Sequence, residues 1–384
     1  MSQCSVTCFD KQVSVGENYR AAVSLHSHTH HSKESLRFIP QFAEKYPLLR
    51  WALERQCSKA PVPVNFQRAY WTPPLSAEMS LEVERNQIEN TLGLKSFVSL
   101  TDHDTIDAPT ILRALPDSKD TPIALEWSVP YAGTVFHLGV HNLPESDAAA
   151  IVADLTAFTQ SPCEQRFVEL VAALDEIPNV LIVFNHPLWD LSELGKAGHE
   201  QAINLFMKAS GKFLHALELN ATRGWGENDK VREMAIRWQL PSISGGDRHG
   251  CEPSSALNLT NAETFSEFIR EVRTEQRSHV LLMPQYAEPR CMRIMQMVLD
   301  VIREYPGHPI GTRKWDNRVF HPARYTEGDW PLSTWWKAPP KFVEYAFAVM
   351  RLLDNATVQK ALKQAMPGEV VDHVATDVSY EATT

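Results

Sequence analysis

The chain has 384 residues, of which 43% are hydrophobic and 22% are charged, close to the averages for globular proteins. This composition excludes a wholly disordered chain, because enough apolar surface is present to form a core. The 37 Lys and Arg residues against 47 Asp and Glu residues give a formal net charge of -10. That charge argues against a general nucleic-acid coat protein, which needs clustered positive charge, but it permits small phosphorylated substrates held by metal ions.

No apolar run in the sequence approaches the roughly 20 residues that span a bilayer. The N-terminal segment has neither the apolar core nor the cleavage site of a signal peptide. The six cysteines are scattered, and none forms a Cys-x-x-Cys pair. We therefore expect a cytoplasmic protein with reduced thiols and no membrane partner.

Short apolar runs that are typical of strands alternate with segments of helical periodicity. The expected strands are residues 21–25, 97–100, 122–125, 135–140, 180–184, 214–219 and 241–244, with 279–283 as an eighth candidate. The expected helices are residues 81–92, 148–158, 164–174, 229–238 and 264–273. This alternation indicates an α/β protein with βαβ units and a mainly parallel sheet. Seven or eight such strands favour a closed barrel over an open sheet.

Two regions interrupt the alternation. Residues 30–80 are rich in proline and aromatic residues and form an expected insertion after the first strand. Beyond residue 285 we expect no strands, only helices at 292–303 and 342–353 around a loop that carries Trp315, Trp330, Trp335 and Trp336. The sequence thus predicts a barrel over residues 1–285 and a helical, Trp-rich extension over residues 286–384 that packs on it. Packing is the expected role of the tryptophans, with a sugar or base platform as the alternative.

Histidine and acidic residues follow most of the expected strands. They are His26, His28, Asp102, His103, Glu126, His137, His141, His186, Glu218, Asp247 and His249. In parallel α/β architectures the carboxyl ends of the strands meet at one face of the sheet and carry the active site. We therefore expect these side chains to converge.

The chemistry of these side chains indicates a metal site. Residues i and i+2 of an extended segment point to the same side, so that His26 and His28 can hold one ion. Imidazole and carboxylate ligands without thiolates suit Zn²⁺, Mn²⁺ or Fe²⁺. Eight or nine ligands exceed what one ion uses, so two or three divalent ions are expected, with the carboxylate of Glu126 as the bridge between them.

Six motifs in this order resemble those of the polymerase and histidinol phosphatase (PHP) superfamily. They are LHSHTH, SLTDHDT, the ALE of Glu126, the FHLG of His137, the NHP of His186 and the GGDRH of Asp247 and His249, spread over residues 22–250. The resemblance implies a distorted (β/α)7 barrel with a trinuclear metal site that hydrolyses phosphate esters. It implies as ligands His26, His28, His103, Glu126, His137, His186, Asp247 and His249.

The sequence departs from this family at one position. The family usually has Asp seven residues after its first His, where this chain has Lys33, and Glu34 follows. Glu34 is a substitute ligand, with His30 or His31 as alternatives; if none binds, the site is binuclear. His141 competes with His137 for one ligand position.

We assign catalytic roles to Glu126, His137, Asp102 and Arg248. Asp102 would orient a ligand rather than bind metal, and Arg248 or Arg223 could hold a phosphate. Glu218 either orients a ligand or caps a loop.

The predicted function is hydrolysis of a small phosphomonoester by a metal-bound hydroxide. The alternatives are a nuclease that cleaves short nucleic acid, an amidohydrolase-like C–N hydrolase and a non-catalytic metal-binding domain. The C–N hydrolases commonly use a modified Lys at a strand end, and none stands there in this sequence. We also expect the insertion or the Trp-rich loop to fold over the site as a lid. Substrate, metal identity and oligomeric state are left open.

Overall fold

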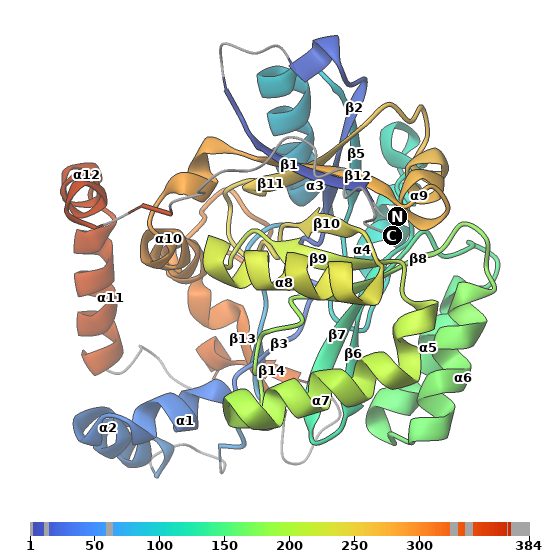
Figure 1. Cartoon of the computed structure of the whole chain (residues 1–384). Helices are drawn as coiled ribbons and strands as arrows, with labels where there is room; N and C mark the ends of the chain where they lie inside the picture. The colour runs from blue at the N-terminus through green and yellow to red at the C-terminus, as the bar shows by residue number, and fades with distance from the viewer. Residues whose placement is uncertain are drawn as a thin grey trace.

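The computed structural model describes residues 3–10, 15–58, 64–322, 329–334, 341–366 and 368–369. In these residues the chain forms a mixed α/β fold with three sheets and twelve α-helices (Figure 1). The predicted α/β class is confirmed. None of the described helices combines the length and apolar character that crossing a membrane requires.

The first sheet contains five strands in the order β1-β12-β11-β2-β5. Their bounds are Gln3–Cys8 for β1, Arg277–Leu282 for β12, Ala256–Thr260 for β11, Ala21–Leu25 for β2 and Lys95–Ser99 for β5. Strand β11 is antiparallel to both neighbours, whereas β1 with β12 and β2 with β5 are parallel. The sequence did not predict β1 or β11.

The second sheet also contains five strands, in the order β10-β9-β8-β7-β6. Their bounds are Ser242–Gly245 for β10, Ala216–Asn220 for β9, Leu181–Asn185 for β8, Thr134–His141 for β7 and Leu125–Tyr131 for β6. Strands β8, β9 and β10 are parallel, but β7 is antiparallel to both β6 and β8.

The antiparallel position of β7 follows from the short connection that precedes it. Only Ala132 and Gly133 separate β6 from β7, and both have positive φ, 49° and 81°. Two central residues of positive φ give the type I′ turn that closes tight hairpins. Because a parallel pair needs a crossover of about a dozen residues, the expectation of a mainly parallel sheet is wrong for this part.

The described residues contain no closed barrel, so the predicted (β/α)7 barrel is not confirmed. Isolated parallel bridges join the two five-stranded sheets, from Ser27 to Arg248 and from His103 to Glu126, and apolar residues of both sheets share a core cluster. Ser27, Arg248 and His103 lie just beyond strand ends, Glu126 lies at the start of β6, and all four residues belong to the predicted motifs. The sheets therefore approach each other where the candidate site was expected.

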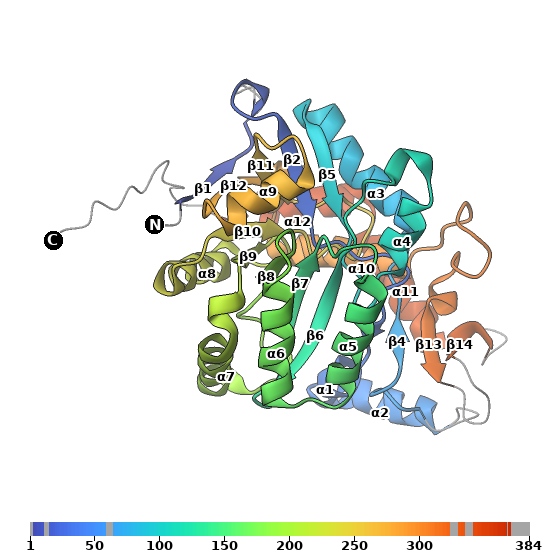
Figure 2. The ribbon, with the colours of Figure 1, turned by 90° about the vertical axis from the view of Figure 1, so that its right-hand side faces the viewer.

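Helices cover the outer faces of both sheets. Helices α5 (Ala148–Gln160), α6 (Glu164–Asp175), α7 (Gly195–Ser210) and α8 (Trp225–Trp238) lie along the second sheet (Figure 2). They enclose the largest core cluster, in which Phe158, Phe167 and Phe206 pack against strand residues such as Phe184. Three helices pack on the first sheet: α3 (Ala77–Asn86), α4 (Asp107–Arg113) and α9 (Phe265–Arg273). Helix α3 continues as a π-helical segment over Gln87–Leu92. Burial on both faces explains why most of the strands are continuous apolar runs.

The insertion and the C-terminal segment build the third sheet together. Its order is β14-β13-β4-β3, with bounds Asp329–Pro331, Val319–Pro322, Tyr70–Trp71 and Glu34–Ser35. The expectation that strands stop after residue 285 is therefore wrong. This sheet joins residues from both sides of the predicted domain boundary at residue 285. The boundary itself stays a prediction.

The remaining helices belong to the insertion and the C-terminal segment. They are α1 (Phe38–Glu44), α2 (Pro47–Cys57), α10 (Arg290–Ile302), α11 (Lys341–Leu353) and α12 (Ala356–Ala365). The rings of Trp315 and of Phe347 on α11 are in edge-to-face contact, with their centres 4.7 Å apart. This contact supports a packing role for Trp315. Trp335 and Trp336 lie outside the described residues.

Candidate metal centre

The strand ends bring the predicted ligands together. Four groups of side chains have ligand atoms within 4.8 Å of one another. The groups are His28, Glu34, His103 and His249; His26, Glu126 and His186; His26, His28 and Asp247; and His103, Glu126 and His137. These groups contain all nine side chains predicted as ligands, and we call them the metal cluster. Neither His30 nor His31 belongs to any of them.

Glu126 lies at the centre of the metal cluster. Its Oε2 atom is 3.1 Å from His26 Nε2 and 3.3 Å from His28 Nε2. Its Oε1 atom is 3.1 Å from His186 Nε2 and 3.4 Å from His137 Nδ1. Since its two oxygens face different imidazoles, the carboxylate can bridge two ions, as the sequence predicted.

Several cluster atoms are buried without a hydrogen-bond partner among the described residues. They are His26 Nε2, His28 Nε2, His103 Nδ1 and Glu126 Oε2. Leaving buried polar atoms without hydrogen bonds is costly, whereas divalent ions held between these side chains would satisfy them. The residues present therefore fit the implied divalent ions, and their nitrogen and oxygen donors suit Zn²⁺, Mn²⁺ or Fe²⁺.

Glu34 occupies the position that the sequence left uncertain. Its Oε2 atom is 3.2 Å from His249 Nε2 and 3.4 Å from His103 Nε2, and Ser32 donates a 2.6 Å hydrogen bond to Oε1. Lys33 points away, with its Nζ 3.2 Å from Asp329 of β14. The geometry favours Glu34 over Lys33, His30 and His31 as the replacement for the family Asp.

A carboxylate behind the metal cluster holds one of its imidazoles and the backbone of a second ligand. Glu218 accepts a 2.5 Å hydrogen bond from His26 Nδ1 and one of 2.8 Å from the backbone N–H of His186. A Cβ on Gly245 would lie 1.7 Å from Glu218 Oε1, so that only glycine leaves room for this carboxylate. Glu218 therefore orients ligands, as carboxylates behind metal-bound histidines do.

Asp102 also supports the site from behind. It accepts hydrogen bonds of 2.5 Å from the backbone N–H and 2.7 Å from the hydroxyl of Thr29, the residue after His28. This contact agrees with the orienting role expected for Asp102, although it acts on the loop rather than directly on an imidazole.

Two side chains singled out by the sequence lie elsewhere. Arg248 donates through Nε to Glu84 at 2.8 Å and through Nη1 to the carbonyl of Gly250 at 2.8 Å, and it also contacts Ser80. The structure thus does not bring its guanidinium to the metal cluster. His141 lies 2.8 Å from Ser99 Oγ and is absent from the cluster, which favours His137.

Backbone strain marks the same strand ends. His26, His186 and Asp247 adopt positive φ values of 63°, 27° and 48°. Non-glycine residues rarely adopt this conformation, and it is concentrated at functional sites.

Sequence reasoning missed Asn185, which donates a 2.9 Å hydrogen bond to Glu126 Oε1. The signal available was a polar side chain at the end of an apolar strand.

The ionisable groups of the metal cluster strongly affect one another. Burial opposes ionisation of Glu126, but the imidazoles of His26, His137 and His103 hold its pKa well below the usual range. Burial lowers the pKa of His103, but the carboxylates of Glu34 and Glu126 outweigh it and raise this pKa to about 10. Protons on imidazoles thus balance the buried carboxylates when no metal does.

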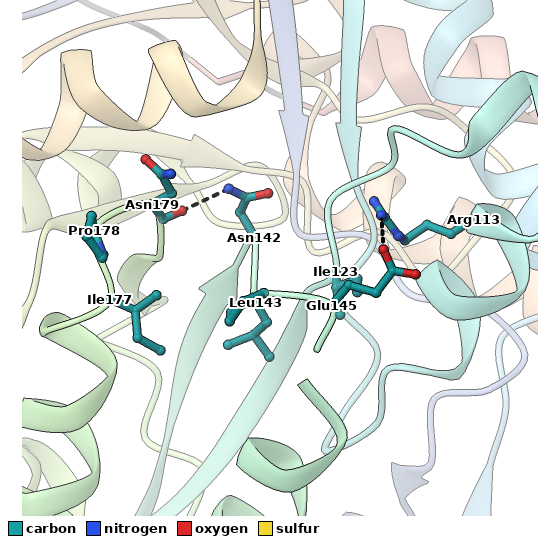
Figure 3. A pocket seen from close by; sticks show the side chains of 9 residues that line it. Arg113, Ile123, Asn142, Leu143, Glu145, Ile177, Pro178 and Asn179 are labelled. Atoms are coloured by element: carbon teal, nitrogen blue, oxygen red, sulfur yellow. Dashed lines mark hydrogen bonds and ion pairs between the residues drawn. The ribbon is translucent and has the colours of Figure 1, made fainter. Parts of the chain in front are cut away.

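A separate cavity of about 290 Å³ lies beyond the N-terminal ends of β6 and β8, away from the metal cluster (Figure 3). Arg113 pairs there with Glu145 at 2.6 Å, and Asn142 donates a 2.9 Å hydrogen bond to the carbonyl of Asn179. Its charged side chains pair with each other, and among the described residues none of the groups that could hold a metal ion lines this cavity.

No protein-family model and no curated protein matches the sequence. The distant structural similarities include three solved structures. PsfC from Pseudomonas syringae is 14% identical, with a TM-score of 0.41 over 73% of this chain and 97% of that one. An amidohydrolase from Chromobacterium violaceum is 13% identical, with a TM-score of 0.34 over 59% and 87%. A protein described provisionally as a metal-dependent phosphoesterase, from Bifidobacterium adolescentis, is 13% identical, with a TM-score of 0.31 over 66% and 95%. Similarities this distant show neither a family nor a function, so the resemblance to the PHP superfamily rests on the sequence motifs.

The bridging position of Glu126 can be tested by metal analysis. We expect Glu126→Gln to lose at least one ion per chain after reconstitution, because a neutral amide bridges two cations poorly. The measurement is elemental analysis of protein loaded with Mn²⁺ or Zn²⁺. The control is Glu200→Gln, at an exposed carboxylate on α7. Full metal content in Glu126→Gln would contradict the bridging role.

Substitutions of Glu34 and Lys33 should have different effects on the metal content. Glu34→Ala should reduce the metal content, because Glu34 lies against His103 and His249. Lys33→Ala should leave the metal content unchanged, because its ammonium pairs with Asp329. The reverse pattern of metal loss would make Lys33 the functional residue and the site binuclear.

Metal binding should release protons. The pKa of His103, raised to about 10, lies above neutrality, so an ion that takes this nitrogen at pH 7 displaces a proton. Affinity should therefore rise as the pH is raised from about 6 to about 9. Calorimetric titration in buffers of different ionisation enthalpy measures the released protons directly. A pH-independent affinity without proton release would show that the imidazoles are already neutral.

Proposed function

We propose that this protein is a metal-dependent hydrolase that acts on a small phosphomonoester. The observation that carries the proposal is the set of four buried ligand atoms, three imidazole nitrogens and Oε2 of Glu126, that have no hydrogen-bond partner among the described residues. When bound, two or three divalent ions would supply charge neutralisation at the phosphoryl oxygens and lower the pKa of a coordinated water towards about 7. The remaining work falls to the protein's own side chains.

The side chains of the metal cluster hold fixed positions for this reaction. Glu218 keeps the Nδ1 side of His26 engaged, so that the Nε2 lone pair faces Glu126. Asn185 holds one oxygen of Glu126 at 2.9 Å. A site fixed in this way need not reorganise during the reaction, which is the main source of electrostatic catalysis.

The most exposed ligands of the metal cluster, His103 and His249, mark an opening of the site to solvent. The side chains of His26, His28 and Glu126 are at most 1% exposed, whereas those of His103 and His249 are 15% and 13% exposed. The ring of Trp71 on β4 lies 5.8 Å from the ring of His249, which places the third sheet beside this opening. A sheet beside the exposed ligands supports a small substrate over a polymer, in line with the lid hypothesis.

The competing activities can be separated with one substrate panel. Metal-loaded protein would be assayed on nitrophenyl phosphate, its diester, a nucleoside monophosphate, a ten-nucleotide RNA and an N-acyl amino acid. We expect the highest kcat/KM for a monoester, and Glu126→Gln prepared in the same way controls for contaminating phosphatases.

Other outcomes would contradict the proposal in different ways. A higher kcat/KM for the RNA would make the protein a nuclease, and turnover of the amide alone would make it a C–N hydrolase. Bound metal without turnover of any substrate would leave a metal-binding domain without this activity.

A further inference from the structure

An arginine–tryptophan pair stands beside the metal cluster and is not explained by metal binding. The guanidinium carbon of Arg223, which follows β9, lies 4.3 Å from the centre of the Trp189 ring. That ring is edge-on to His186 at 5.1 Å and to His137 at 6.5 Å. Arg223 and the imidazoles of two candidate ligands thus contact the same indole.

The loop that carries Arg223 is held from two sides. Thr222 Oγ1 lies 3.2 Å from Asp247 Oδ2, which ties the preceding residue to the metal cluster. From α10, Arg290 donates to the carbonyl of Thr222 at 3.2 Å, and Arg293 donates to the carbonyl of Arg223 at 3.2 Å. The guanidinium therefore projects from an anchored backbone.

The Nε–H group of Arg223 has no hydrogen-bond partner among the described residues. The arginine side chain is only 12% exposed, and the nearest carboxylate, Glu227, is 3.8 Å away. Burial lowers the pKa of Arg223 although Asp247 and Glu227 oppose this shift, and arginine remains charged all the same. A buried cation with an unpaired donor is unfavourable unless a ligand meets it.

We propose that Arg223, supported by Trp189, binds the phosphoryl group of the substrate. The planar guanidinium presents parallel N–H groups that match two oxygens of a tetrahedral phosphoryl group. A dianionic monoester gains more from this contact than a singly charged diester, and a neutral amide gains least. Arg223 would thus select phosphomonoesters at the metal cluster, a role that rests on the proposed function.

The experiment compares Arg223→Gln and Arg223→Lys with the wild-type protein, all loaded with metal. We expect full metal content in both variants. The inhibition constant of inorganic phosphate and the KM for nitrophenyl phosphate should rise about 10- to 100-fold in Arg223→Gln. The kcat/KM ratio of monoester to diester should fall. Arg223→Lys keeps the charge but loses the paired donors, so it should restore only part of the phosphate affinity.

The chain offers a matched control. Arg232 lies over the ring of Trp225 at 5.7 Å on α8 and pairs with Asp229 at 3.0 Å, away from the metal cluster. Arg232→Gln removes a similar stack and should change neither phosphate inhibition nor the activity ratio. An effect equal to that of Arg223→Gln would show that loss of any such stack acts through stability.

The remaining outcomes separate this inference from the proposed function. Unchanged phosphate inhibition in a fully metal-loaded Arg223→Gln would overturn the role of Arg223 while phosphatase activity persists. Loss of metal from this variant would overturn it too, by showing a structural role. If the wild-type protein hydrolyses no phosphoester but binds inorganic phosphate in calorimetry, and Arg223→Gln abolishes that binding, the anion site stands and the proposed function fails.

Discussion

The buried carboxylate of Glu126 is the group on which the arrangement of the site depends. Five imidazoles lie within 3.4 Å of its two oxygens, and its side chain is 1% exposed. Such a concentration of ionisable groups is stable only if their charges and hydrogen-bonding atoms are balanced. Divalent ions would provide that balance, and the residues behind the metal cluster hold the candidate ligands in place.

The fold supplies this convergence through the ends of its two large sheets. The bridges from Ser27 to Arg248 and from His103 to Glu126 occur where the sheets meet, next to the ligands. Glu218 and Gly245 then fix the backs of the imidazoles, and the positive φ of His26, His186 and Asp247 turns their side chains into the site. Strain of this kind persists only where the surrounding structure enforces it.

The third sheet connects the metal cluster to the C-terminal segment. Glu34 is the first residue of β3, which pairs with Trp71 of β4, and Trp71 in turn pairs with Val319 of β13. A candidate ligand is thus held by strands from two distant parts of the chain. The same sheet lies beside the more exposed candidate ligands His103 and His249. The third sheet thus both supplies Glu34 to the metal cluster and borders its more exposed side.

The sequence by itself determined the α/β class, most strand positions and the identity of the clustered side chains. It could do so because apolar runs define strands locally and because each candidate ligand directly follows a run or lies within one. Only the tertiary structure showed that Glu34 and His137 lie in the metal cluster, whereas Lys33, His141 and Arg248 are engaged with other partners. The long-range partners Asp329, Ser99 and Glu84 bind Lys33, His141 and Arg248, respectively, and these contacts are not visible in a sequence motif. The strand pairing of β7, β11 and β13 likewise depends on turn geometry and distant partners, which hydrophobic periodicity does not encode.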